Sequence, residues 1–132
     1  MARTIGKESK MNKDYPAYRK HLQRTIADLR KRIPGAMAGF GQLHQESMKA
    51  GALDEKEKEL IALGIGITSR CDGCITFHTH EALAHGATTE EINETIAVAI
   101  SMGGGPALMY AAHAVEALEQ FQEAGLAGAR QG

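Results

Sequence analysis

The chain contains no tryptophan, only three prolines and two cysteines, and its aromatic content is 5%. Because large rings are scarce, the core must be built from aliphatic and small side chains in close helix contacts. No uncharged run is long enough to span a bilayer, and the basic first residues are not followed by the apolar segment of a secretory signal. These absences predict a cytoplasmic protein without a membrane partner.

The length of 132 residues predicts a single domain spanning residues 1–132, with an ordinary soluble composition of 43% hydrophobic and 23% charged residues. Charge is distributed unevenly, since residues 1–33 carry ten Lys or Arg against three Asp or Glu. A basic segment can indicate nucleic-acid binding, but no aromatic or Gly-rich binding motif accompanies this one. We therefore expect no nucleic-acid partner, and a basic helix face that is solvated or lies on an acidic surface of this chain or a neighbouring subunit.

Hydrophobic periodicity predicts an all-α fold of about six helices, because no stretch alternates with a period of two. Residues 1–13 are polar and aperiodic, which predicts a disordered arm. Residues 14–33 form an amphipathic helix that Pro34 ends, and residues 35–124 form the core. The apolar stripe of the first helix consists of Tyr15, Tyr18, Leu22, Ile26, Leu29 and Ile33.

Capping signals place the starts of two further helices. Asp54 is followed three residues later by Glu57, and Thr88 by Glu91, which is the capping-box spacing. Residues 60–67 carry no polar side chain, so this run is expected to be buried on more than one side. The break at residues 103–106 separates the last two helices, the second of which is rich in alanine.

The sharpest local motif is Cys71-Asp72-Gly73-Cys74 at the predicted start of a helix. This spacing allows one disulfide, and the helix N-terminus stabilises a thiolate. His78 follows Cys74 by four residues, so both lie on one helix face, where an imidazole can take the thiol proton. Asp72 favours the helix dipole but opposes ionisation of the neighbouring thiols. Glu59, at the border of the apolar run, could orient the imidazole.

The spacing of Glu59, Cys71, Cys74 and His78 resembles the alkylhydroperoxidase D-like (AhpD-like) branch of the carboxymuconolactone decarboxylase superfamily. Residues 102–108 also resemble its single-motif members, and the resemblance covers residues 35–122. It implies an all-α homo-oligomer, a hexamer or alternatively a trimer, with antioxidant peroxidase or thiol–disulfide activity. In that family, a glutamate–histidine relay deprotonates the second cysteine, here Cys74, and the first, here Cys71, closes the disulfide.

The leading hypothesis is therefore an enzyme that reduces hydroperoxides or protein disulfides with a thiol or protein reductant. Its expected catalytic residues are Glu59, Cys71, Cys74 and His78, with no cofactor and no metal. Three alternatives stay open: lactone decarboxylation, a redox-sensing protein, and a zinc module using the same four side chains. The sequence leaves open which cysteine is the primary nucleophile, although the i,i+4 spacing favours activation of Cys74.

The remaining histidines carry weaker signals. His80 is expected on the side of the helix opposite His78, so the two should not share a site. His44, His85 and His113 are isolated in the sequence and are interpreted as structural or surface residues.

Overall fold

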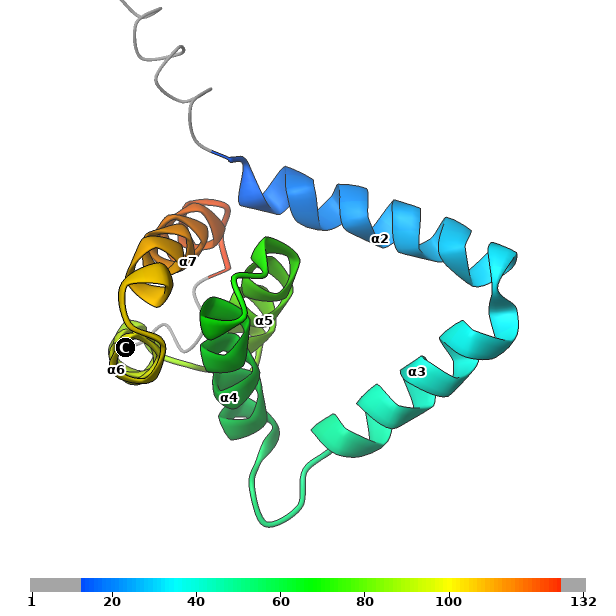
Figure 1. Ribbon diagram of the computed structural model, residues 1–132, viewed down its shortest axis with the longest axis horizontal. Coiled ribbons are helices and arrows are strands. Elements are labelled where there is room, and N and C mark those ends of the chain that lie inside the picture. Colours follow the sequence, from blue (N-terminus) through cyan, green and yellow to red (C-terminus); the bar gives the residue numbers. More distant parts are fainter. Residues whose placement is uncertain (1–12, 127–132) are drawn as a thin grey trace, which may run out of the picture.

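The computed structural model describes residues 13–126. No strand occurs within this range, which confirms the predicted all-α class. The prediction of a disordered arm at residues 1–13 falls outside the described residues, except for Lys13. The described helices are α2 Tyr15–Arg32, α3 Pro34–Met48, α4 Glu55–Thr68, α5 Asp72–Ala84, α6 Thr89–Gly103 and α7 Gly105–Glu123 (Figure 1).

Local sequence signals set the starts of the helices. The side chain of Asp54 accepts a hydrogen bond from the Glu57 backbone, and the Glu57 side chain accepts one from the Asp54 backbone, completing the predicted capping box of α4. Thr88 and Glu91 form the same reciprocal cap on α6. Among residues 13–126, no helix is long and apolar enough to cross a membrane.

Helices α4 to α7 pack into a compact body that holds nearly the whole core. Its core combines branched aliphatic side chains with alanines, and α7 contributes a stripe of alanines spaced three or four residues apart, which lets this helix approach its neighbours closely. Two of the α4 residues in the core, Leu63 and Ile67, are one turn apart. The buried alanines are Ala82, Ala87, Ala99, Ala107, Ala111, Ala114 and Ala117.

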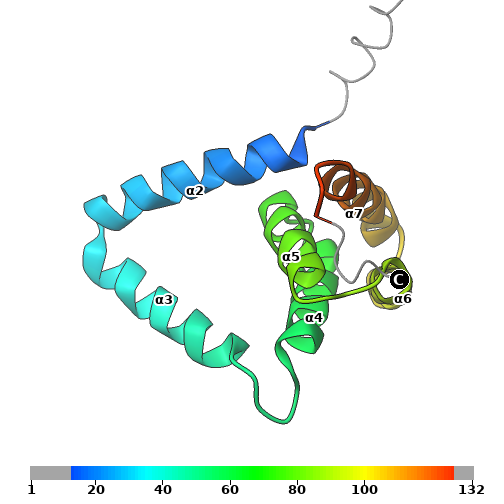
Figure 2. The ribbon, with the colours of Figure 1, turned by 180° about the vertical axis from the view of Figure 1, so that it is seen from behind.

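Helices α2 and α3 form an arm that leaves this body and turns back towards α4 (Figures 1 and 2). The start of α2 is fixed by buried Tyr15, whose backbone N–H donates to Gln120 of α7 over 2.7 Å. An ion pair of 3.5 Å joins Arg19 to Glu81 of α5, so the basic face of α2 contacts an acidic residue of its own chain at this point. The other basic residues of α2, Lys20, Arg24, Arg30, Lys31 and Arg32, are exposed. Further along, Leu29 and Ile33 are exposed, and the predicted stripe is buried only at its first residue.

Helix α4 corrects the expectation that residues 60–67 are buried on several sides. Ile61 and Ile65 are exposed, because they point to an open apolar groove between α4 and α6 rather than into the core. The groove has a volume of about 370 Å³. Its lining residues are uncharged: Leu60, Ile61, Gly64, Ile65, Thr68, Thr95, Val98, Ala99 and Met102.

Candidate functional site

Cys71 and Cys74 form a disulfide at the N-terminus of α5. Their spacing in the sequence indicated that such a bond is possible. Cys71 is the N-cap residue, and its Sγ accepts a hydrogen bond of 3.1 Å from the backbone N–H of Cys74. The Cα atoms lie 5.2 Å apart, within the ordinary range for a disulfide. When the bond is reduced, the free N–H groups of this helix end favour a thiolate at Cys71.

A tight turn between α4 and α5 positions the two cysteines. The backbone N–H of Cys71 donates to the Gly66 carbonyl over 3.0 Å, and Arg70 adopts a positive φ of 58° in the turn. A Cβ atom at Gly66 would lie 2.9 Å from the Cβ of Cys74, closer than real Cβ contacts. Gly66 therefore lets the backbone of α4 approach Cys74 directly.

The same helix pairing brings Glu59 to His78. Glu59 lies seven residues before Gly66, and His78 four residues after Cys74, so each pair shares one helix face. Oε1 of Glu59 and Nδ1 of His78 are 2.7 Å apart, and Glu59 is buried. With Glu59 ionised, His78 donates its Nδ1 proton to the carboxylate and leaves Nε2 as the proton acceptor. This contact also satisfies a carboxylate that would be costly to bury alone.

Helix α3 contributes a neighbour that sequence reasoning missed. The His44 ring centroid is 6.3 Å from that of His78 and 6.4 Å from that of Phe40, which stacks on it. His44 was interpreted as isolated because 34 residues separate it from His78 in the sequence. Its approach depends on the return of the arm towards α4, which no local pattern reveals.

His113 and Lys13 were also missed, and both bind Asp72, the residue after Cys71. The Lys13 ammonium lies 2.7 Å from Oδ2 of Asp72, and Nδ1 of His113 lies 2.7 Å from Oδ1. Burial raises the pKa of Asp72, but the hydrogen bonds from Lys13 and His113 outweigh it and hold the pKa below its usual value.

His80 lies on the far side of α5 from His78, as predicted. Its ring contacts Glu81 over 2.9 Å and meets the edge of Phe121 of α7. His80 is therefore separate from the Glu59–His78 pair.

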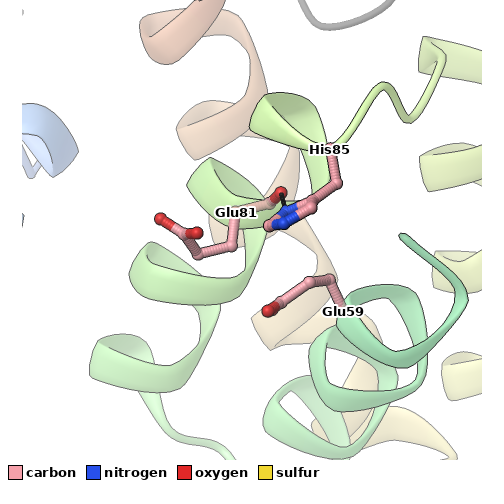
Figure 3. Close-up of side chains that lie close together, drawn as sticks. All are labelled: Glu59, Glu81 and His85. Carbon is pink, nitrogen blue, oxygen red and sulfur yellow. Dashed lines mark hydrogen bonds between the residues drawn. The ribbon is translucent and has the colours of Figure 1, made fainter. Parts of the chain in front are cut away.

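Glu59, Glu81 and His85 each offer one ligand atom within 4.8 Å of the others, a donor set that could hold a metal ion (Figure 3). These groups already have other partners. His85 donates from Nδ1 to the Glu81 carbonyl over 2.8 Å, and its Nε2 lies 3.3 Å from Glu55. A cation would have to displace such contacts, and the group does not include the two cysteines of the zinc alternative.

Comparisons with known proteins place the chain among relatives of similar sequence and fold. An uncharacterised protein of Cupriavidus necator is 39% identical over 94 residues, covering 71% of this chain and 83% of its own length. A protein encoded in the cox locus of Paracoccus denitrificans is 39% identical over 74 residues, covering 56% of this chain and 67% of its own.

Solved structures show the same fold. An apo carboxymuconolactone decarboxylase family protein from Legionella pneumophila superposes with a TM-score of 0.78 at 46% identity, covering 81% of this chain and 96% of that one. A family member from Thermotoga maritima superposes with a TM-score of 0.77 at 29% identity, covering 85% of this chain and 96% of that one. A part in the antioxidative response has been suggested for that protein. The profile of the Carboxymuconolactone decarboxylase family matches residues 34–117, nearly two thirds of the sequence. This chain therefore belongs to the carboxymuconolactone decarboxylase family.

Proposed function

We propose that this protein is a thiol-dependent peroxidase that cycles between the Cys71–Cys74 disulfide and the dithiol. The observation that carries the proposal is the disulfide at a helix N-terminus, one turn from an imidazole that a buried carboxylate holds. The relation to the Thermotoga protein of suggested antioxidative role supports the same assignment.

The first step uses Cys74 as the nucleophile. Nε2 of His78 takes the thiol proton, and Glu59 stabilises the resulting imidazolium. The thiolate sulfur attacks one peroxide oxygen, the O–O bond breaks, and Cys74 becomes a sulfenic acid. The leaving alkoxide accepts the proton from His78 and departs as the alcohol.

The second step closes the disulfide. The Cys71 thiolate attacks the sulfenic sulfur of Cys74, the S–O bond breaks, and the departing hydroxide takes a proton to become water. One hydroperoxide and one dithiol therefore give one alcohol, one water and one disulfide. An external dithiol then reduces the disulfide through a mixed disulfide on the half-exposed Cys71.

The test is reduction of cumene hydroperoxide and hydrogen peroxide with dithiothreitol or dihydrolipoamide as reductant. Wild type should turn over, and Cys74→Ser should fall to the uncatalysed rate. Trapping with dimedone should label Cys74 in a Cys71→Ser variant. A sulfenic acid trapped on Cys71 in Cys74→Ser, with none on Cys74 in Cys71→Ser, would reverse the two roles. Equal turnover by Cys74→Ser would refute the proposal. Lactone decarboxylation needs no redox pair, so it would survive that substitution.

We further propose that the partner of this chain is a second copy of itself, in a hexamer or a trimer. Helix α3 buries no residue within the chain, although Phe40 and Leu43 are large and apolar. The groove between α4 and α6 offers a matching uncharged surface. Because His44 of α3 lies beside His78, packing of this arm would also enclose the site.

Light scattering tests the assembly. Wild type should have three or six times the monomer mass, and Phe40→Glu should reduce it. A monomeric wild type at micromolar concentration would refute the proposal. Lys20→Glu is a matched control, because this exposed residue on α2 carries no apolar surface into the expected contact.

A further inference from the structure

Side chains from two distant segments converge on Asp72, the first of the two residues between the cysteines. Lys13 precedes α2, Asp72 begins α5, and His113 lies in the middle of α7. Both contacts to the carboxylate are 2.7 Å long, although the partners lie 59 and 41 residues away in the sequence. The carboxylate therefore has one basic group on each oxygen.

Aromatic rings hold both basic groups in place. The Lys13 ammonium lies 4.7 Å from the centre of the Tyr18 ring, and the His113 ring is 4.7 Å from that of Tyr110. The titratable and charged groups around Asp72 come from the segment before α2, from α2 and from α7: Lys13, Tyr15, Tyr18, Tyr110, His113 and Glu116. The pKa of Asp72 is below its usual value, so the carboxylate is an anion at neutral pH.

An anion at this position matters to the neighbouring thiol. A carboxylate next to Cys71 opposes the formation of a second negative charge there, whereas the helix N-terminus favours it. Lys13 and His113 offset the repulsion between the Asp72 carboxylate and a Cys71 thiolate. The stabilisation of that thiolate by the helix N-terminus is unchanged. We propose that His113 is a positioning residue for Cys71: together with Lys13 it fixes and compensates the Asp72 carboxylate, so that reduced Cys71 ionises more readily.

This inference rests on the proposed function, in which a Cys71 thiolate closes the disulfide by attacking the Cys74 sulfenic acid. Loss of His113 would then slow that second step and leave the first unchanged. The ionisation itself can be measured without any peroxide, which separates a failure of this inference from a failure of the proposed peroxidase activity.

The experiment measures the pKa of Cys71 in a Cys74→Ser background, from the pH dependence of alkylation by iodoacetamide. Adding His113→Asn should raise that pKa and lower the thiolate fraction at pH 7 by about 3- to 10-fold. Asp72→Asn should lower the pKa instead. In the Asp72→Asn background, His113→Asn should have no further effect, because His113 acts through the carboxylate. His113→Lys should restore the original value, because a lysine ammonium can donate to the same carboxylate oxygen of Asp72.

His80→Asn is the matched control, because His80 makes a similar contact to a carboxylate further along α5. It should leave the pKa of Cys71 unchanged. An unchanged pKa in His113→Asn would overturn the inference, and so would a full shift that persists in the Asp72→Asn background. If circular dichroism shows that His113→Asn does not fold, Lys13→Met tests the same compensation from the other oxygen. A smaller rise in pKa is expected there, and no rise would overturn the inference.

Discussion

Two carboxylate–imidazole pairs lie next to the disulfide, with the same 2.7 Å separation but in different surroundings. In the Glu59–His78 pair the side chains are 9% and 18% exposed, and both belong to adjacent helices of the body. In the Asp72–His113 pair they are 17% and 35% exposed, and the Lys13 ammonium is a third partner on the other carboxylate oxygen. Distance alone therefore does not distinguish the pairs; burial and the third partner do.

The difference in burial suits the two pairs to different tasks. A proton relay benefits from a site with little water, where the imidazolium–carboxylate attraction is strong. A group that only compensates a fixed charge can tolerate solvent, at the cost of a weaker and salt-dependent effect. In the proposed function, the Glu59–His78 pair accepts and returns the proton of Cys74. The contacts of Lys13 and His113 with Asp72 compensate the negative charge beside Cys71.

The largest expected effect comes from breaking the buried pair. His78→Asn should slow peroxide oxidation of the reduced protein by about 10²- to 10³-fold, since a general base contributes in that range. Glu59→Gln should slow it less, because it weakens the orientation of His78 but keeps the ring. The oxidation rates of both variants are measured by stopped-flow, as the loss of free thiols under excess peroxide at several pH values. His80→Asn on the same helix is the control, and a rate in His78→Asn within threefold of wild type would contradict the relay.

The next effect concerns the glycine that allows α4 and α5 to approach. Gly66→Ala places a Cβ 2.9 Å from the Cβ of Cys74, so the backbone must shift, at a cost of about 1–3 kcal/mol in the free energy of unfolding. Gly64→Ala is the matched control on the same helix. Its Cβ would meet only Thr95 at an ordinary 3.6 Å, and the better helix propensity of alanine should stabilise it by up to about 1 kcal/mol. Urea unfolding measures the free energy of unfolding of both variants. Equal values would contradict the close packing of α4 against Cys74.

The sequence predicted what depends on local geometry. The capping boxes at Asp54 and Thr88 located two helix starts, because these contacts span three residues. For the juxtaposition of Glu59 with His78, the place of Glu59 beside the apolar run was a weak signal that the family resemblance strengthened, because the contact requires α4 to pack against α5. His113 could not be found in this way, because its partner is 41 residues distant and nothing in its own helix indicates the contact.

Exposure was predicted less well than secondary structure. The apolar stripe of α2 and the run at residues 60–67 both suggested burial, yet Leu29, Ile33, Ile61 and Ile65 are exposed. Periodicity shows that a helix has an apolar face but does not say whether this chain or another covers it.

A smaller effect should appear in the acid stability of the less buried pair, Asp72–His113. The folded pKa of Asp72 is lowered, so its contribution to stability is complete above its unfolded pKa of about 3.9 and is lost as pH falls through the folded value. The difference in free energy of unfolding between wild type and Asp72→Asn should therefore shrink below about pH 4. Urea unfolding at several pH values measures it. A difference that stays constant down to pH 2.5 would contradict the charge-compensated contact.

The smallest expected effect involves His85, which lies beyond the buried pair at the exposed end of α5. Its hydrogen bond to the Glu81 carbonyl raises its pKa against the effect of burial, and the carboxylates of Glu55, Glu81 and Glu59 raise it further. Because the folded pKa is raised, the stabilisation is complete below the unfolded value of about 6.5 and is lost as pH rises through the folded value. The stability difference between wild type and His85→Asn should therefore be larger at pH 5.5 than at pH 8.5. Glu55→Gln, which removes the carboxylate 3.3 Å from Nε2, should reduce that pH dependence without abolishing it. A difference that grows with pH would show that the neutral imidazole is the stabilised form, and that the acidic end of this site does not favour a cation.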